Sequence, residues 1–299
     1  MNIVFIGSQP IGHDCLNEII KMKIGIKAVF TFKPDTHEKW EKSVEEIAKK
    51  HKIPLYFSDD LTTKKIKKLK PELIVVIGYR KIFPQEILDI PKFGVVGIHA
   101  SLLPTLRGQA PLNWSIILNH KKTGATLFKM NKSIDSGDII DQKEIQIIQE
   151  DNIEKIKEKI RLISVKLISN NILKILSGTA KITKQPIKGT YGCARIPEDG
   201  KIYWQKDSIE IFNLIRACEE SYPAFTFLGN KKIFVTKAKL HKSKEKYFGT
   251  PGQIGMTFED GSVLVITGNG VLRISKVKNR SNIEVDAKTL FKSSKLRLK

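Results

Sequence analysis

The amino-acid sequence predicts an α/β fold built on a doubly wound, mostly parallel sheet, followed by a small β-barrel. Three features of the sequence lead to this prediction. Apolar strand-like runs alternate with helix-like runs over residues 3–98, a polar stretch broken by Gly and Pro covers residues 177–201, and short apolar segments separated by turn dipeptides follow. The alternation is typical of helices packed on both faces of a parallel sheet, and the short strands are typical of a barrel.

The first part of the chain supplies the parallel sheet. The apolar runs predict strands at Ile3–Gly7, Ile26–Phe32, Leu73–Ile77 and Gly94–Ile98. The amphipathic runs between them predict helices at Pro10–Lys23, Ser43–Lys52, Thr62–Lys70 and Pro84–Leu88. A parallel sheet of this kind binds ligands at the carboxyl ends of its strands.

Later elements close the first core and form the second. We expect a helix at Pro111–Leu118, two strands at Gly124–Met130 and Gly137–Ile147, and a long helix capped by Asp151 and Asn152 that reaches about Ile175. A helix at Ser208–Cys218 precedes expected strands at Thr226–Leu228, Ile233–Lys239, Gly252–Met256, Ser262–Thr267 and Gly270–Val277. The expected divisions are a first domain at residues 1–180, a linker draped over the surface at 181–200 and a second domain at 201–299.

Composition limits the classes of protein. A hydrophobic fraction of 41% and a charged fraction of 28% in 299 residues exclude a disordered chain and a coiled-coil rod. No apolar run is long enough for a membrane helix, and the first residues lack the features of a signal peptide. Three cysteines without C-x-x-C spacing argue against a disulfide framework and a zinc site. We therefore expect a cytoplasmic protein without a metal.

The net charge of +21 permits two interpretations. Most of the basic residues are lysines, which favours a compositional bias with solvated lysine side chains. The alternative is a positive field that attracts phosphates, either on a nucleotide-linked substrate or on RNA. Gly7 and Gly12 match neither the dinucleotide nor the nucleoside-triphosphate glycine motif, so enzymes of those classes are disfavoured.

Two residues stand where a sheet of this kind carries its chemistry. His99 follows the buried strand 94–98, at the edge where ligands bind, and is placed for proton transfer. Asp135 lies in the turn-forming run Ser133–Asp138, which can hold a carboxylate at one point. From the residues alone, His99 could equally be a hydrogen-bonded histidine that ends a strand, and Asp135 a turn former. On separate loops over one sheet edge, the two would form an acid–base pair.

Several motifs in order resemble a known family. His99–Pro104 with Arg107–Gly108 and Ala110–Pro111, then Thr123–Thr126 and Ile134–Asp138, look like the signature of formyltransferases that use 10-formyltetrahydrofolate. The last third, from Ile202–Trp204 to Thr267–Gly270, resembles the OB-like C-terminal domain of methionyl-tRNA formyltransferases and their sugar-modifying relatives. The resemblance therefore covers the whole chain and implies a Rossmann-like formyltransferase domain followed by an OB-like barrel.

The resemblance also implies catalytic residues, with one departure. The family uses an Asn, a His and an Asp; the His falls on His99 and the Asp on Asp135, but the Asn falls on Gly97. In the family the His stabilises the oxyanion, the Asp takes up the amine proton and the Asn donates to the same oxyanion. We expect Gly97 to leave a gap of about one short side chain, which a water or a substrate group could fill.

The cofactor and substrate residues follow by the same resemblance. It implies 10-formyltetrahydrofolate as formyl donor, bound by the segments Lys81, Ile82 and Phe83, Ser101, Leu102, Leu103 and Pro104, and Asn131, Lys132, Ser133 and Ile134. It implies substrate contacts from Tyr79, Arg80 and Arg107. From the residues alone, core packing explains the apolar members equally well.

The acceptor amine is less firmly indicated. Methionyl-tRNA formyltransferases carry a basic loop after the second strand, whereas Phe32–Ser43 is shorter and of mixed charge. This segment, Gly78–Arg80 and Ala110–Trp114 resemble instead the formyltransferase domain that acts on UDP-4-amino-4-deoxy-arabinose. We therefore expect a nucleotide-linked amino sugar as acceptor, with initiator methionyl-tRNA as the alternative. A third alternative, prompted by Gly97 and the charge, is a relative that binds folate or RNA without catalysis.

Overall fold

The computed structural model of the protein describes residues 2–33, 43–219, 221–279 and 281–299. These residues form two compact units, each built around its own sheet. The first unit comprises Met1–Pro111, Lys122–Gln146 and Lys157–Gly192, and the second Leu112–Lys121, Ile147–Ile156 and Cys193–Lys299. The chain therefore enters the second unit three times, and the polar stretch expected as a linker is divided between the units at Gly192.

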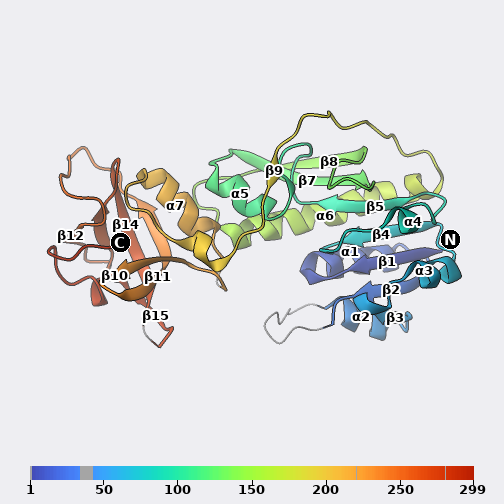
Figure 1. The fold of residues 1–299 in the computed structure, drawn as a ribbon, viewed down its shortest axis with the longest axis horizontal. Helices are drawn as coiled ribbons and strands as arrows, with labels where there is room; N and C mark the ends of the chain where they lie inside the picture. The colour runs from blue at the N-terminus through green and yellow to red at the C-terminus, as the bar shows by residue number, and fades with distance from the viewer. Residues whose placement is uncertain (1, 34–42, 220, 280) are drawn as a thin grey trace. The chain divides into compact units, whose positions relative to one another are not determined.

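The first unit contains the predicted sheet (Figure 1). Its strand order is β3-β2-β1-β4-β5-β7-β8; the first five strands are parallel, and β7 and β8 run antiparallel. The strands are β1 (Ile3–Gly7), β2 (Ile26–Thr31), β3 (Leu55–Phe57), β4 (Leu73–Ile77), β5 (Val95–His99), β7 (Lys122–Lys129) and β8 (Ile139–Gln146). The order reverses between β1 and β4, which is the place where doubly wound sheets open a binding crevice.

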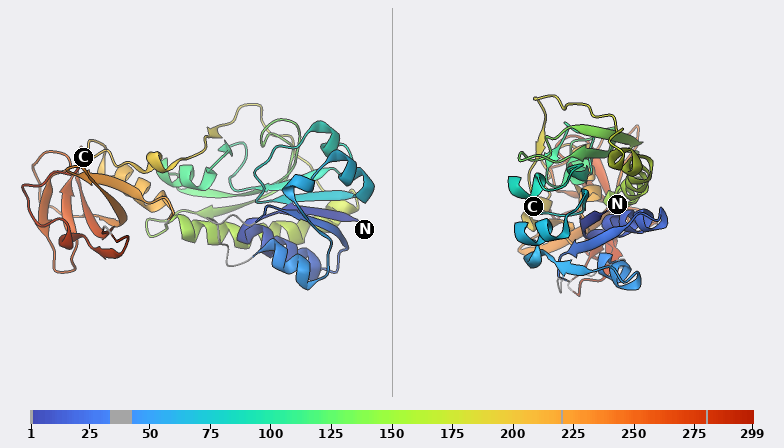
Figure 2. Two further views of the ribbon diagram at one scale, coloured as in Figure 1. Left: turned by 60° about the horizontal axis from the view of Figure 1, so that its bottom comes forward. Right: turned by 90° about the vertical axis from the view of Figure 1, so that its right-hand side faces the viewer.

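Helices cover both faces of this sheet, as Figure 2 shows. Val4 and Ile6 of β1 pack in one cluster with Ile66 of α3 and Ile87 of α4. On α1, Gly12 lies so near β4 that a Cβ there would stand 3.1 Å from the Ile77 carbonyl oxygen. The helices of the first unit are α1 (Gln9–Lys21), α2 (Val44–Lys50), α3 (Thr63–Leu69), α4 (Gln85–Leu88) and most of α6 (Ile153–Leu176), with a 3-10 turn η1 at Ser58–Asp60. The helix α5 (Pro111–Ile117) lies mostly in the second unit.

The second unit is built on a closed antiparallel barrel and contains α7 (Ser208–Ala217), most of α5 and the first residues of α6. Its strands are ordered β10-β11-β14-β13-β12, with β15 paired to β14. The last residues close the barrel, because Lys299 exchanges backbone hydrogen bonds with Phe227 and Leu298 donates to the Gly252 carbonyl. The strands are β10 (Ala224–Leu228), β11 (Lys231–Leu240), β12 (Ile254–Thr257), β13 (Val263–Ile266), β14 (Val271–Lys278) and β15 (Glu284–Asp286), with 3-10 turns η2 (Pro197–Gly200) and η3 (Ala287–Thr289).

The structure confirms the α/β sheet and the small barrel and adds elements that the sequence patterns missed. The short strands β3 and β15 were not predicted. The helix cap at Asn152 is confirmed, since its Oδ1 accepts a hydrogen bond from the Lys155 amide at 3.1 Å. Within the expected linker, β9 (Tyr191–Gly192) pairs with β6 (Arg107–Gly108), so this part of the stretch is bound to the first unit.

Candidate active site

His99 is the last residue of β5, at the carboxyl end of the parallel sheet. It pairs in register with Thr126 of the antiparallel strand β7 and is only 8% exposed. Its Nε2 lies 2.7 Å from the carbonyl oxygen of Leu106, which can only accept. Nε2 therefore carries a proton and donates it to Leu106, and this bond orients the ring.

Asp135 lies in the loop between β7 and β8 and reaches His99. Its Oδ2 stands 3.4 Å from Nδ1 of His99 and accepts a hydrogen bond of 2.8 Å from the Gly108 amide. The backbone of Asp135 is left-handed, with φ of 47°, a conformation that Asp adopts more readily than most residues. The two residues that the sequence singled out are thus brought together on one sheet edge.

The tautomer of a neutral His99 follows from its contacts. Since Nε2 of His99 is the donor to Leu106, Nδ1 of a neutral imidazole presents a lone pair toward the Asp135 carboxylate. A ring nitrogen and a carboxylate oxygen therefore face each other at this edge of the sheet. Side chains of these two types carry out general acid and base chemistry.

Gly97 lies on β5 two residues before His99, and its surroundings correct one expectation. A Cβ at this position would stand 3.2 Å from Sδ of Met130 and 3.4 Å from the Val76 carbonyl oxygen. The Met130 side chain packs over the glycine and already occupies the space that was expected to hold a water or a substrate group. The expected gap was wrong because its filler comes from the end of β7, far from Gly97 in the sequence.

The loop Ser101–Pro104 follows His99 and is held by two polar side chains from the antiparallel strands. Thr126 Oγ1 donates to the Ser101 carbonyl at 2.6 Å and accepts from the Leu103 amide at 3.1 Å. Gln142 Nε2 donates to the Leu103 carbonyl at 2.8 Å. Ser101 and Leu103 are buried, whereas Leu102 and Pro104 are half-buried, so the loop offers mainly its backbone and the latter two side chains.

The second predicted cofactor segment is an exposed turn. Asn131 organises it, since its Oδ1 accepts from the Ser133 amide at 3.0 Å and from the Ser136 hydroxyl at 3.1 Å. Lys132 and Ser133 are exposed, and Ile134 is exposed to 50%. An apolar side chain left in water beside Asp135 is suited to contact with a bound ligand.

The third predicted segment divides into buried and exposed residues. Phe83 is buried in the core, and its ring stacks on Tyr79 with centroids 5.5 Å apart. Tyr79 stacks in turn on Phe32 at 4.7 Å, and burial raises the pKa of its hydroxyl. Arg80, Lys81 and Ile82 are exposed, Ile82 to 71%. Ile82 and Lys81 are therefore available to a ligand, whereas the Phe83 ring serves the core.

Arg107 was predicted to contact substrate, and the structure gives its guanidinium another set of contacts. The residue is 3% exposed. Nη2 donates to Gln185 Oε1 and to the Pro186 carbonyl, both at 2.9 Å. Nη1 lies 3.4 Å from the Ile187 carbonyl oxygen and 3.3 Å from the Tyr191 hydroxyl. These hydrogen bonds hold the segment 185–191 and use the donors of the Arg107 guanidinium. A contact between Arg107 and substrate therefore stays a prediction.

Sequence reasoning missed two polar residues that support the site, Gln142 and Gln185. It gave a third, Thr126, no role of its own, although Thr126 lies in the motif Thr123–Thr126. All three bond to the loops beside His99 or Asp135. Gln142 lies in a strand whose alternating pattern indicates only which side chains are buried, and Gln185 lies in a polar stretch without periodicity, so a single sequence does not separate these two glutamines from ordinary surface residues.

Comparison with known proteins identifies the family. Residues 1–172 match the formyl transferase family, and residues 196–295 match the formyl transferase C-terminal domain. The chain belongs to the formyltransferase family.

This formyltransferase is similar to both a methionyl-tRNA formyltransferase and a bifunctional polymyxin resistance protein. It is 33% identical to the methionyl-tRNA formyltransferase of Thermodesulfovibrio yellowstonii, over 98% of this chain and 96% of that protein. It is 36% identical to the bifunctional polymyxin resistance protein ArnA of Wigglesworthia glossinidia brevipalpis, over 85% of this chain and 40% of that protein. The family is therefore shown, and the acceptor is not decided by these relatives.

Solved structures share the fold. The sugar 3N-formyl transferase WlaRD, studied with dTDP and 5-N-formyl-THF, has a TM-score of 0.72 at 22% identity over 92% of this chain and 97% of that one. An N-formyltransferase from Helicobacter canadensis, in complex with folinic acid and dTDP-3-aminofucose, has a TM-score of 0.73 at 22% identity over 91% of this chain and 98% of that one. At these identities the likeness establishes the architecture.

Metal-binding clusters and membrane-spanning helices are both absent from the described residues. Within residues 2–33, 43–219, 221–279 and 281–299, no group of three or more His, Cys, Asp or Glu side chains could hold a metal ion. Over the same residues, no helix has the length and hydropathy needed to cross a membrane.

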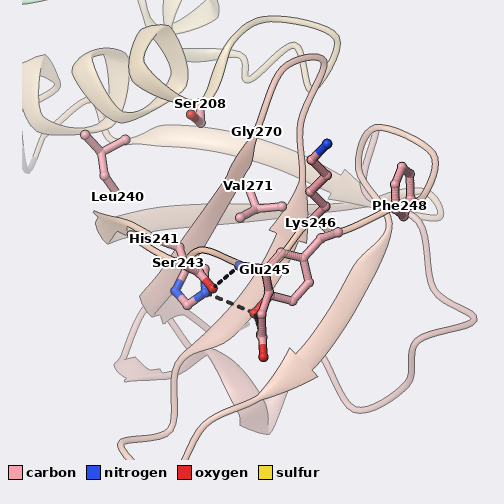
Figure 3. A pocket seen from close by; sticks show the side chains of 10 residues that line it. Ser208, Leu240, His241, Ser243, Glu245, Lys246, Phe248, Gly270 and Val271 are labelled. Carbon is pink, nitrogen blue, oxygen red and sulfur yellow. Dashed lines mark hydrogen bonds between the residues drawn. The ribbon is translucent and has the colours of Figure 1, made fainter.

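The barrel has a surface cavity of about 370 Å³, shown in Figure 3. Its polar side chains bond to one another: His241 Nε2 lies 3.3 Å from the Tyr247 hydroxyl, which donates to Glu245 at 2.8 Å. The rest of the wall is formed by Ser208, Leu240, Ser243, Lys246, Phe248, Gly270 and Val271. The pocket lacks a His–carboxylate pair comparable to His99 and Asp135 among its lining residues.

Proposed function

We propose that this formyltransferase transfers a formyl group from 10-formyltetrahydrofolate to a primary amine, with His99 and Asp135 as the proton-transferring pair. The observation that carries the proposal is the distance of 3.4 Å between His99 Nδ1 and Asp135 Oδ2 at the carboxyl end of β5. Formyl transfer needs a base for the proton that the amine loses and a donor for the oxyanion that forms. In this pair, Asp135 can serve as the base and His99 as the donor.

The residues present fit a folate donor. Ile82 and Ile134 are exposed apolar side chains on two of the three predicted folate segments, and Leu102 on the third is half-buried. An aromatic ring system with polar edges would cover such side chains and bond to loop backbone. Structures that share the fold were solved with 5-N-formyl-THF and with folinic acid, which supports this donor class.

The roles of the chain's own residues follow from the geometry. When bound, 10-formyltetrahydrofolate supplies the formyl carbon: the amine nitrogen bonds to it, its bond to the folate nitrogen breaks, and that nitrogen takes the proton. Asp135 accepts the proton that leaves the amine. His99, charged at Nδ1, donates a hydrogen bond to the formyl oxygen while Leu106 holds Nε2. The Gly108 amide keeps the carboxylate in place.

For the acceptor we propose a nucleotide-linked amino sugar. The segments Gly78–Arg80 and Ala110–Trp114 support it through their resemblance to the domain that acts on UDP-4-amino-4-deoxy-arabinose. The short segment after β2 falls mostly on residues 34–42, which lie outside the described residues.

Initiator methionyl-tRNA is the second candidate, and a feature of the barrel favours it. A cavity of about 400 Å³ is lined by Tyr203, Lys201, Arg297 and Lys299. Lys201 Nζ stands 5.3 Å from the Tyr203 ring centroid, so an aromatic face and cations occur together, as at sites that bind single-stranded nucleic acid. Identity to a methionyl-tRNA formyltransferase over nearly the whole chain points the same way.

One experiment separates the two acceptors. The protein is incubated with 10-formyltetrahydrofolate and either dTDP- and UDP-linked amino sugars or charged initiator tRNA, and formylated products are detected by mass. We expect turnover of an amino sugar with a shallow dependence on salt, since few phosphates are neutralised. Turnover of charged tRNA with a steep salt dependence, and none of any amino sugar, would reverse the assignment.

A further inference from the structure

Residues 183–192, which we call the strap, are bound tightly across the loops of the active site. The amides of Arg107 and Gln109 donate to the carbonyls of Thr190 and Gly192, both at 2.8 Å. At Gly189 the approach is so close that a Cβ would stand 2.6 Å from the Pro104 carbonyl oxygen. The strap is therefore a fixed part of the first unit, although its sequence is typical of a linker.

Gln185 connects the strap to the loop that carries Asp135. Its Oε1 accepts from Arg107 Nε at 3.2 Å and from Nη2 at 2.9 Å. Its Nε2 donates to the Asp135 carbonyl at 2.9 Å and to the Gly137 carbonyl at 2.5 Å. Because guanidinium groups only donate and backbone carbonyls only accept, these four bonds fix the orientation of the amide.

The consequence concerns the left-handed backbone of Asp135. This conformation is less favourable for Asp than the right-handed one, so neighbouring contacts help to hold it. The two hydrogen bonds from Gln185 hold the backbone on both sides of Ser136. The carboxylate then reaches the Gly108 amide and stands beside His99. Without the two hydrogen bonds from Gln185, the loop that carries Asp135 could turn the carboxylate away from the His99 imidazole.

We propose that Gln185 is a positioning residue for formyl transfer: one end of its amide is anchored by Arg107, and the other holds the Asp135 loop in its reactive geometry. The effect on catalysis rests on the roles proposed above for His99 and Asp135. The effect on the position of Asp135 does not depend on those roles.

The two ends of the amide can be tested separately. Gln185→Glu keeps an acceptor for Arg107, now as an ion pair, but removes the donor to the Asp135 and Gly137 carbonyls. Gln185→Met removes both ends. Ile187→Ala, at an almost fully exposed strap residue that offers Arg107 only its backbone carbonyl, is the matched control.

Three consecutive amides report the outcome without any acceptor. The amides of Arg107 and Gln109 bond to the strap, and the Gly108 amide between them bonds to the Asp135 carboxylate. Residue-resolved hydrogen exchange by NMR measures all three. In Gln185→Glu we expect the Gly108 amide to exchange up to about tenfold faster, as the loss of one hydrogen bond allows, while its two neighbours stay within about threefold of wild type.

Activity is measured on the same variants, with the acceptor that the wild-type protein turns over. We expect kcat of Gln185→Glu to fall by about 10- to 100-fold through misplacement of Asp135, with the KM for donor and acceptor within about threefold. Unchanged Gly108 exchange in Gln185→Glu would overturn the proposal and leave Gln185 as a clamp for the strap. Faster Gly108 exchange with unchanged kcat would support the positioning of Asp135 and instead refute the catalytic role proposed for Asp135.

Discussion

Two arginines, Arg107 in the first unit and Arg273 in the barrel, are satisfied in different ways. Within the described residues, Arg107 donates to neutral oxygens, such as Gln185 Oε1 and the Pro186 carbonyl. Arg273 instead pairs with the Asp260 carboxylate at 2.9 Å and bonds to Ser262. Hydrogen bonds from Ser262, helped by Arg273, lower the pKa of Asp260 to about 2.

The difference concerns the partners that hold each acid. Hydrogen bonds from Ser262 are the main cause of the lowered pKa of Asp260, and the Arg273 guanidinium adds to them. Arg107 lies close to the site, yet its donors go to the strap, and the carboxylate of Asp135 accepts from an amide and faces His99. Asp135 therefore lies beside the imidazole that we propose as its partner in proton transfer.

The largest expected effect separates these two acids. His99→Ala and Asp135→Ala should each lower the rate of formyl transfer by ~10²–10⁴, because acid–base catalysis contributes about that much. Both residues lie on loop or strand-end positions, so circular dichroism should show an intact fold. Asp260→Ala, the matched control, should leave the rate unchanged. Retention of more than about a tenth of the activity in either active-site variant would refute the assigned roles.

The second prediction compares the arginines directly. Arg107→Met removes the donor from several partly buried hydrogen bonds at once, including those to Gln185 and the Pro186 carbonyl, and should lower the free energy of unfolding by about 1–3 kcal/mol. Arg273→Met removes a partly exposed ion pair and should cost about 0–1 kcal/mol. Urea titrations followed by circular dichroism measure both. Equal losses would show that the burial of Arg107 has no special energetic consequence.

Gly97 offers a smaller effect on activity. An added carboxamide at residue 97 would supply a further oxyanion donor beside the one proposed from His99. The new side chain in Gly97→Asn must displace the half-buried Met130 side chain. We therefore expect kcat/KM to rise by about tenfold, which is less than the ~10²–10³ rate effect of a fully preorganised oxyanion donor. Gly97→Ala brings the same Cβ without the amide and is the control. A ratio near one would show that residue 97 does not face the reacting carbon.

The smallest effect is the pH dependence of the barrel. Asp260 has a lowered pKa in the folded state, so its contribution to stability is complete above the ordinary carboxyl range and is lost as the pH falls through about 2. The wild-type melting temperature should therefore fall more steeply between about pH 4 and pH 2 than that of Asp260→Asn. Parallel curves for the two proteins would remove the distinction drawn between Asp260 and Asp135.

Much of the fold could be predicted because most of its strands and helices are marked by short, continuous sequence patterns. Apolar runs such as Leu73–Ile77 define buried strands directly, and His99 follows such a run at the edge where doubly wound sheets bind ligands. The strand β3 was missed because Leu55–Phe57 is too short and only half-buried to show a period.

The rest of the site depends on contacts between distant residues. Met130 over Gly97, and Gln185 between Arg107 and Asp135, join parts of the chain that no periodicity links. In the sequence, polar side chains that hold loops cannot be told apart from ordinary surface residues. Arg107 illustrates the limit: its position in the motif predicted a substrate contact, and only the structure reveals the strap that occupies it.

The central claim is that Asp135 acts through its proton, and one variant tests it most directly. Asp135→Asn keeps an oxygen that can accept from the Gly108 amide, so the loop geometry is retained, but a carboxamide cannot take up the amine proton. Formyl transfer is measured in a single turnover with saturating donor and acceptor, and donor binding is measured separately. The account predicts a rate at least ~10²-fold below wild type with unchanged donor affinity. A rate within about threefold of wild type would contradict it.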